Sequence, residues 1–150
     1  MRTKALLYGA LGAALMLAGL AAAGSALADP KGVWLNERQD SHVKIYACPD
    51  DEDELCGEIV WLKNPLGKDG KPRRDVKNEN ESLRGRQILG VQVIMGLEYE
   101  GDGEWEDGEI YNPRDGESYD AEMEEIDANT LKVSGCIWFL CESETWTRVE

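Results

Sequence analysis

Histidine is almost absent from this chain of 150 residues, which contains a single one, His42. Asp40 and Ser41 directly precede it, but three consecutive residues cannot converge as a catalytic triad, because neighbouring side chains on a strand point to opposite faces. Carboxylates are so numerous that no pair of them stands out as an acid and a base. We therefore expect no enzyme activity and interpret His42 as a surface histidine.

Positive charge is also scarce, since 16 lysines and arginines stand against 30 aspartates and glutamates, for a net charge of −14. A surface this acidic repels phosphate, which excludes nucleic acid as a partner. The densest acidic run, residues 50–54, follows Pro49 and lacks the glycine and the alternating ligand spacing of a calcium loop. We expect a hairpin loop there, and we expect no metal ion and no cofactor.

Only one long apolar run is present, near the start of the chain. Arg2 and Lys4 precede the apolar residues 5–23, and Ala26-Leu27-Ala28 has the small residues of a signal-peptide cleavage site. This pattern is typical of an export signal, although an apolar run of this length could also stay in a membrane as an uncleaved anchor. We expect cleavage.

Cleavage would remove residues 1–28 and leave residues 29–150, which is enough for one domain with a modest core. No second apolar run follows, so we expect no transmembrane segment after cleavage and a protein that is periplasmic or secreted. Arg2 and Lys4 would be lost and no acid would be, which changes the net charge from −14 to −16.

Cysteine is limited to four residues, all beyond the predicted signal. An even number in an exported chain favours disulfides over metal. We expect local pairing of Cys48 with Cys56 and of Cys136 with Cys141, and each bond would stabilise the fold by roughly 2–3 kcal/mol. A zinc site built from all four thiolates is the alternative, but neither pair has the C-x-x-C spacing.

Short runs with a period of two dominate the rest of the chain. Val43, Ile45 and Ala47, for example, place aliphatic side chains on one face of a strand. Turn residues separate most of the runs, so the sequence predicts an antiparallel meander, and closure into a barrel removes its exposed edges. The predicted strands cover residues 33–35, 42–47, 55–62, 91–99, 104–111, 117–126, 130–138 and 144–149.

Residues 63–89 break this rhythm and predict one long insertion loop. Residues 78–86 could form a short helical turn, with Asn78 or Asn80 as its N-cap. Such a concentration of positive charge could bind an anionic group, or it could pair with nearby acids. The basic residues of the loop are Lys63, Lys68, Lys71, Arg73, Arg74, Lys77, Arg84 and Arg86.

The two ends of the predicted barrel resemble those of calycin (lipocalin-like) proteins. Gly32-Val33-Trp34 opens the first strand as G-x-W, and Arg148 lies in the last strand, next to the first in a closed meander. In such barrels an N-terminal tryptophan closes one end and a C-terminal basic residue packs across it. The resemblance implies a structural contact between Trp34 and Arg148, worth on the order of 1 kcal/mol or more when desolvated.

The body of the chain resembles the secreted bacterial family known as domain of unknown function 2147, for which no activity is established. The resemblance covers Gly32 to Val149. Asn112 departs from the family pattern, which usually has aspartate there, and this argues against a metal or acid role at that turn. The matching segments are residues 55–62, 69–72, 75–78, 83–86 with Gly90, 108–113, 116–119, 131–136 and 146–149.

A candidate ligand site lies within the insertion loop. Asp75 and Asn78, followed by Arg84 and Arg86, could present polar groups to a carboxylate, phosphate or sugar. Alternatively, Asp75 and Asn78 cap the turn and the arginines pair with barrel acids. With aromatic residues from the strands, the predicted ligand-binding set is Trp61, Asp75, Asn78, Arg86, Tyr111 and Tyr119.

Together these features predict an exported, all-β, eight-stranded antiparallel lipocalin-like barrel. Its expected function is the non-enzymatic binding of a small amphipathic or anionic ligand at the barrel mouth, near residues 63–89. The alternative is an envelope interaction or stress module that acts through its outer surface and has a packed interior.

Overall fold

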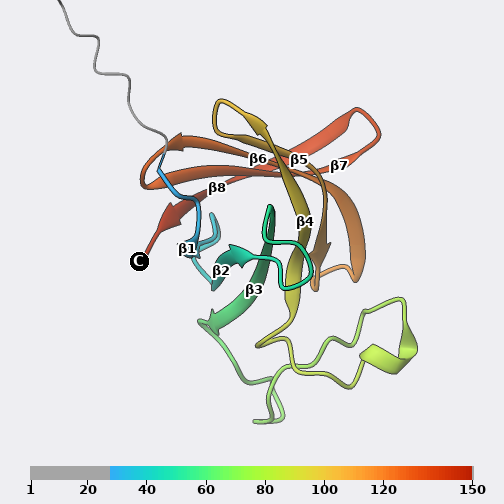
Figure 1. The fold of residues 1–150 in the computed structure, drawn as a ribbon. Helices are drawn as coiled ribbons and strands as arrows, with labels where there is room; N and C mark the ends of the chain where they lie inside the picture. The colour runs from blue at the N-terminus through green and yellow to red at the C-terminus, as the bar shows by residue number, and fades with distance from the viewer. Residues whose placement is uncertain (1–27, 150) are drawn as a thin grey trace, which may run out of the picture.

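The structure is a computed structural model and describes residues 28–149. Eight antiparallel strands in this part of the chain form a closed barrel in sequence order (Figure 1), which confirms the predicted architecture. The strands are β1 (Gly32–Leu35), β2 (Ser41–Ala47), β3 (Glu54–Leu62), β4 (Gln92–Gly101), β5 (Glu104–Asn112), β6 (Glu117–Asp127), β7 (Thr130–Ile137) and β8 (Leu140–Arg148).

The short first strand closes the barrel. β1 pairs with β2 along its whole length and with β8 through Trp34 opposite Arg148 and Leu35 opposite Thr147. The backbone N–H of Val149 also donates to the carbonyl of Val33 at 2.7 Å. Closure through β1 reduces the exposed edge of the sheet, which is the physical reason that an eight-stranded meander adopts this form.

Trp34 is fully buried at one rim of the barrel, where its indole N–H donates to the carbonyl of Pro30 at 2.8 Å. The guanidinium carbon of Arg148 lies 4.1 Å from the centre of the Trp34 ring. The same guanidinium donates to the carbonyls of Asp29, Lys31 and Ala128. Arg148 therefore joins the N-terminal segment to the β6–β7 turn across this rim.

Apolar side chains from all eight strands fill the barrel interior. These include Ile45, Ile94, Leu97, Met123 and Leu131, all with less than 2 % of their surface exposed. They form one continuous cluster with Trp34, Trp105 and Trp146. Each such side chain contributes on the order of 1.5–3 kcal/mol by leaving water.

The predicted disulfides are both present. Cys48 bonds to Cys56 across the β2–β3 turn, and Cys136 bonds to Cys141 within the β7–β8 hairpin. The alternative of a zinc site made by all four thiolates is therefore wrong, because no cysteine of the chain is left as a free thiol.

The last hairpin corrects the predicted strand boundaries. Residues 130–138 were expected to be strand and residues 139–143 a loop, but β7 ends at Ile137 and β8 already begins at Leu140. Trp138 lies in the tight turn with a φ of 56°. The sequence hid this because the first half of β8 is mostly exposed and has no apolar alternation.

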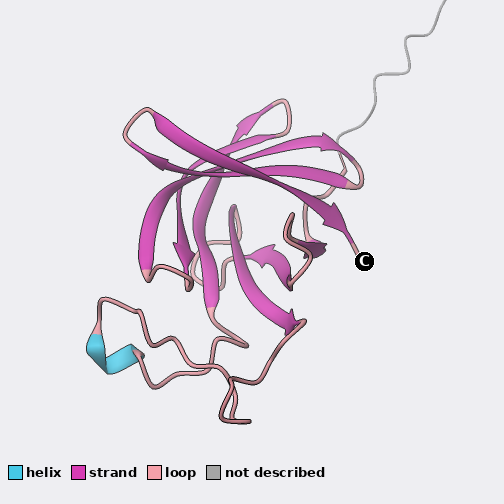
Figure 2. Cartoon of the chain, turned by 180° about the vertical axis from the view of Figure 1, so that it is seen from behind, coloured by secondary structure: helices cyan, strands magenta, loops and turns pink. Residues whose placement is uncertain are grey.

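The predicted insertion loop leaves the barrel after β3 and returns at β4. Figure 2 shows its single helical turn, the 3-10 helix η1 (Glu81–Leu83), away from the strands. Asn80 caps η1 by accepting a hydrogen bond from the Ser82 backbone N–H, so the N-cap is Asn80 and not Asn78. Within the described residues, no helix is both long and apolar enough to cross a membrane. The predicted export signal lies, except for Ala28, outside the described residues.

Candidate ligand-binding cleft

Four of the six predicted ligand-binding residues meet in one hydrogen-bonded network, which we call the loop anchor (Asp75, Asn78, Arg86 and Tyr111). The Tyr111 hydroxyl donates to Asp75 Oδ1 at 2.5 Å, and Asn78 Nδ2 donates to Asp75 Oδ2 at 3.0 Å. Arg86 Nε and Nη2 lie 2.9 and 2.8 Å from the same Oδ2. Asp75 has no exposed surface. Both of its oxygens are thus satisfied within the protein.

The loop anchor keeps the Tyr111 hydroxyl protonated. Burial raises the pKa of the Tyr111 hydroxyl to about 12, and the hydrogen bond to Asp75 and the charge of Asp75 act in the same direction. The tyrosine therefore remains a donor across the physiological range. A buried carboxylate would be costly alone, but here it has the Arg86 guanidinium and two neutral donors.

This network ties the insertion loop to the barrel wall. Asp75, Asn78 and Arg86 belong to the loop, whereas Tyr111 belongs to β5. Within the loop, the Asp75 N–H also donates to the Arg86 carbonyl at 3.0 Å, which joins the two chain segments that carry the anchor. Asp75 and Arg86 point at each other, so their first role is to hold the loop. The second alternative raised by the sequence is met only in part, because Arg86 does pair with an acid, but that acid is Asp75 of the same loop and not an acid of the barrel.

A second contact joins the loop to the β5–β6 turn. Gly116 has a φ of 87° and lies so close to Lys77 that a Cβ atom there would overlap the Lys77 carbonyl. Only glycine combines this conformation with this approach. The turn and the loop are therefore pressed together, and a cleft opens beside their contact.

The remaining two predicted residues lie elsewhere. Trp61 is about two-fifths exposed and stacks on His42 with ring centres 4.4 Å apart. Tyr119 pairs in register with Ile110, so its side chain leaves the sheet on the face opposite to that of Tyr111. Its hydroxyl donates to Asp115 at 3.0 Å. The structure therefore does not bring Trp61 or Tyr119 into the loop anchor.

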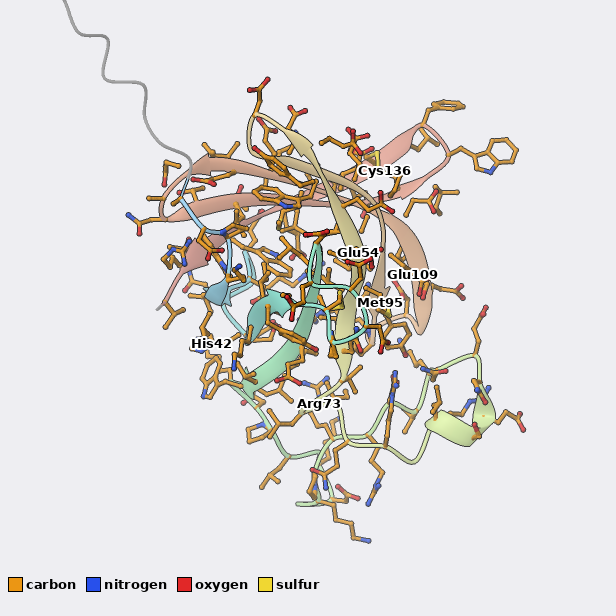
Figure 3. All side chains as sticks on the ribbon, in the orientation of Figure 1. His42, Glu54, Arg73, Met95, Glu109 and Cys136 are labelled. Carbon is orange, nitrogen blue, oxygen red and sulfur yellow. A yellow bond between two sulfur atoms is a disulfide. The ribbon has the colours of Figure 1, made fainter. Side chains whose placement is uncertain are left out.

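A cleft of about 510 Å³ lies between the loop and the β5–β6 turn, and we call it the basic cleft. Proline and aliphatic side chains supply its apolar surface, and basic side chains surround them. Figure 3 labels one of the latter, Arg73, at the base of the loop. The lining residues are Gly67, Asp69, Lys71, Pro72, Arg73, Arg74, Val76, Lys77, Ile88, Pro113 and Arg114.

Most of the positive charge in the basic cleft is unpaired. Among the described residues, no ion pair joins Lys71, Arg73, Arg74 or Lys77 to a carboxylate. Arg74 donates instead to the Gly85 carbonyl, and Lys77 Nζ to the Arg114 carbonyl. Four uncompensated cations on a chain of net charge −14 create a strong local field that attracts anions.

Arg114 is the exception in this lining, because it pairs with Asp40 of the β1–β2 turn. Burial opposes ionisation of Asp40, but hydrogen bonds from Arg114 and Asn36 outweigh it and lower the pKa of that carboxyl. The pair fixes one wall of the cleft. Sequence reasoning included the loop cations but missed Pro113 and Arg114, whose only signal is a proline and a basic residue in a turn.

The opposite rim of the barrel has a larger cleft of about 690 Å³, which we call the acidic cleft. The Tyr99 and Trp105 rings pack against each other within it at a tilt of 49°, with ring centres 5.2 Å apart. Lys31 is the only basic residue of its lining, which makes it a poor site for an anion. The acidic residues of its lining are Asp29, Asp51, Glu52, Asp53, Glu54 and Glu98.

Comparison with known proteins agrees with the fold. Residues 32–148 match a family described as an uncharacterized protein conserved in bacteria (DUF2147). A solved structure, described as protein HP1028 from the human pathogen Helicobacter pylori and as belonging to the lipocalin family, is similar in fold with a TM-score of 0.69. It is 20 % identical and is covered over 84 % of its own chain and 82 % of this one. No curated protein matches the sequence.

Proposed function

Since the chain belongs to the bacterial family DUF2147, whose description includes no activity, we propose a function from its geometry: non-enzymatic binding of a small anionic or amphipathic ligand in the basic cleft. The observation that carries this proposal is the set of unpaired cations, Lys71, Arg73, Arg74 and Lys77, around an apolar surface. The lipocalin-like fold, which suggests small-ligand binding, supports it.

The ligand in this proposal has two parts. A carboxylate or phosphate pairs with the guanidinium groups of Arg73 and Arg74, which can form bidentate contacts. An apolar body lies on Pro72, Val76 and Ile88. A volume of about 510 Å³ is that of an ordinary small-molecule site. Because the barrel interior is packed, the ligand lies under the loop and outside the core.

The loop anchor supports this site from behind. Asp75 neutralises Arg86, so Arg86 does not compete with the cleft for the anion, and Tyr111 ties the same loop to β5. A rigid loop holds Arg73 and Arg74 in place before the ligand arrives, which lowers the ordering cost of binding. Asp75, Asn78 and Arg86 thus act by positioning, and the ligand contacts come from their neighbours.

Calorimetric titration with octyl phosphate tests the proposal, with inorganic phosphate and an octyl trimethylammonium salt as separate probes. We expect the octyl phosphate to bind most tightly and the cation not to bind. The variant with Arg73→Gln and Arg74→Gln should bind about a hundredfold more weakly or worse, because it loses two charge-assisted hydrogen bonds that are worth roughly 1.5–3 kcal/mol each. Equal affinity of this variant and the unmodified protein would overturn the proposal.

A matched control removes two positive charges elsewhere. Arg38 and Lys132 are exposed, and they lie on the β1–β2 turn and on β7, outside the lining of the basic cleft. The Arg38→Gln and Lys132→Gln variant has the same net charge as the cleft variant. It should retain the affinity of the unmodified protein, which separates a specific site from a general effect of charge.

A second candidate function, an interaction module that acts through its outer surface, is favoured by the packed barrel interior. Either function fits a protein that is exported to a periplasm or secreted, and the two disulfides support that location because such bonds persist in oxidising compartments. Sequencing the N-terminus of the protein isolated from the cell envelope tests export, and we expect Asp29 as the first residue.

A further inference from the structure

The β7–β8 hairpin ends in four apolar residues that face water, which we call the apolar tip (Ile137, Trp138, Phe139 and Leu140). Their exposed fractions are 61, 87, 84 and 70 %. In Figure 1 this hairpin projects past the barrel wall, at the upper right. A contiguous group of large apolar side chains on the surface marks an interaction site more often than it marks ordinary exposure.

The apolar tip is held in a fixed shape. Cys136 and Cys141 face each other in the β7–β8 register and are joined by a disulfide directly below the tip; Figure 3 labels Cys136 there. Trp138 lies in the turn with positive φ. A preformed hairpin presents its two aromatic side chains with little further ordering cost, as the anchor residues of an interface do.

Acidic side chains surround the base of the tip, and we call them the acidic collar (Asp120, Glu122 and Glu142). Asp120 lies opposite Cys136 in the sheet, and Glu142 follows Cys141. A Glu122 carboxylate oxygen lies within 4.8 Å of the sulfur atoms of both cysteines. The surface that fits this feature is therefore an apolar slot with a positive rim. A negatively charged membrane does not fit it.

The basic cleft of this same chain has that chemistry. Its surface includes Pro72, Val76, Ile88 and Pro113, and every basic residue of its lining except Arg114 lacks a carboxylate partner among the described residues. Its volume of about 510 Å³ is that of a site for a drug-sized molecule. Two aromatic side chains are of roughly that size. Trp138 is almost wholly exposed, so the tip does not fill the cleft of its own chain.

We propose that the apolar tip of one copy inserts into the basic cleft of a second copy, with the acidic collar against the cleft cations. The loop follows β3 and the tip follows β7, and in an up-and-down barrel both connections lie at the same rim. Two copies that meet rim to rim can exchange both contacts and close as a symmetric dimer. The collar and cleft charges offset part of the repulsion between two acidic chains.

This inference uses the same cleft as the proposed function but does not depend on the small ligand. The two occupants compete, so a small amphipathic anion releases the dimer. Octyl phosphate binding at protein concentrations low enough for the dimer to dissociate tests the cleft alone. If the unmodified protein binds octyl phosphate but does not dimerise, the proposed dimer is wrong and the proposed function stands.

Sedimentation equilibrium of the disulfide-intact protein measures the dimer. We expect the variant with Trp138→Ser and Phe139→Ser to dimerise at least tenfold more weakly. Its thermal midpoint should equal that of the unmodified protein at concentrations where both are monomeric, because both side chains are exposed. A control with Val60→Ser and Ile126→Ser also removes two exposed apolar side chains, from β3 and β6, and should leave the dimer intact.

A charge exchange tests the pairing itself. Glu142→Lys and Arg73→Glu should each weaken the dimer about fivefold or more, and their combination in one chain should restore most of the loss, because each contact then pairs a lysine with a glutamate again. Failure of the combination to recover any affinity contradicts the proposed pairing. So does a dimer that persists without Trp138 and Phe139.

A protein that is monomeric at every concentration would also overturn the proposal. In that case, a blue shift of tryptophan fluorescence on phosphatidylcholine vesicles, absent from the Trp138→Ser variant, would assign the tip to a lipid surface.

Discussion

The two rims of the barrel each use an arginine beside an aromatic ring, but in different ways. At one rim Arg148 lies 4.1 Å from the Trp34 ring and donates its hydrogen bonds to backbone carbonyls. At the other rim Arg86 lies 5.4 Å from the Tyr111 ring and pairs with the buried Asp75 carboxylate. The first arrangement closes the barrel, and the second holds a loop against it.

The two arginines therefore have different roles: Arg148 contributes to the stability of the whole barrel, and Arg86 keeps the insertion loop in place. Trp34 belongs to the continuous core, so its loss affects every strand. The loop anchor lies mainly outside the strands, so its loss should release the loop before the barrel unfolds. A scaffold stabilised by apolar packing thus carries a loop stabilised by charge, and each can be tested by substitution.

Breaking the barrel rim should have the largest effect. Trp34→Ala removes a fully buried aromatic side chain and should lower the free energy of unfolding by roughly 3–5 kcal/mol. Urea denaturation followed by circular dichroism measures this, with ligand affinity unchanged in the fraction that folds. Trp61→Ala, which removes a half-exposed tryptophan, is the control and should cost under about 1 kcal/mol. A small effect of Trp34→Ala would show that the rim does not close the barrel.

Breaking the loop anchor should have the next largest effect. Asp75→Ala leaves Arg86 without its partner. Because the Arg86 side chain is 35 % exposed, water can solvate it in part, and we expect the free energy of unfolding to fall by about 2–4 kcal/mol. Arg86→Ala leaves the fully buried Asp75 charge with only neutral donors and should cost at least as much.

The variant that carries both changes sharpens the test. Its loss should be clearly smaller than the sum of the single losses, because neither charge is then left unpaired. If Asp75 and Arg86 were only ligand contacts, as the sequence predicts, the double variant would keep its stability and lose binding. Because the two residues hold the loop, we expect lower stability and weaker binding together. Hydrogen exchange should show faster opening confined to the loop, and strictly additive losses would contradict the ionic anchor.

The second contact of the loop predicts an intermediate effect. Gly116→Ala forces a Cβ into the Lys77 carbonyl and places alanine at a φ of 87°, where the conformation alone costs roughly 1–2 kcal/mol. Gly85→Ala, in the insertion loop itself, is the control, since a Cβ there meets no atom within 4 Å. Limited proteolysis should cut the loop faster only in the first variant, and equal cleavage rates would show that the turn does not hold the loop.

The barrel could be predicted from the sequence because short alternating runs and turn residues fix strands locally. The tip hairpin could not, since exposed β8 residues such as Leu140 and Glu142 carry no inward and outward pattern. The sequence predicted that Asp75, Asn78, Arg86 and Tyr111 belong to one site, but it did not predict which of them bond to one another. Tyr111, the partner of Asp75, comes from 36 positions away, and no local signal shows which side of β5 the loop covers.

The smallest effect concerns the proton of the Tyr111 hydroxyl. Tyr111→Phe removes one hydrogen bond to Asp75 and should cost about 1–2 kcal/mol at neutral pH. Because the folded pKa is raised from 10.0 to about 12, the tyrosine contributes stability that is complete below pH 10 and is lost as the pH rises toward 12. The free energy of unfolding of the unmodified protein should therefore converge on that of Tyr111→Phe over this interval. Lysine and other tyrosine titrations are common to both proteins and cancel in the difference. A difference that stays constant with pH would mean that the Tyr111 proton is not held by the loop anchor.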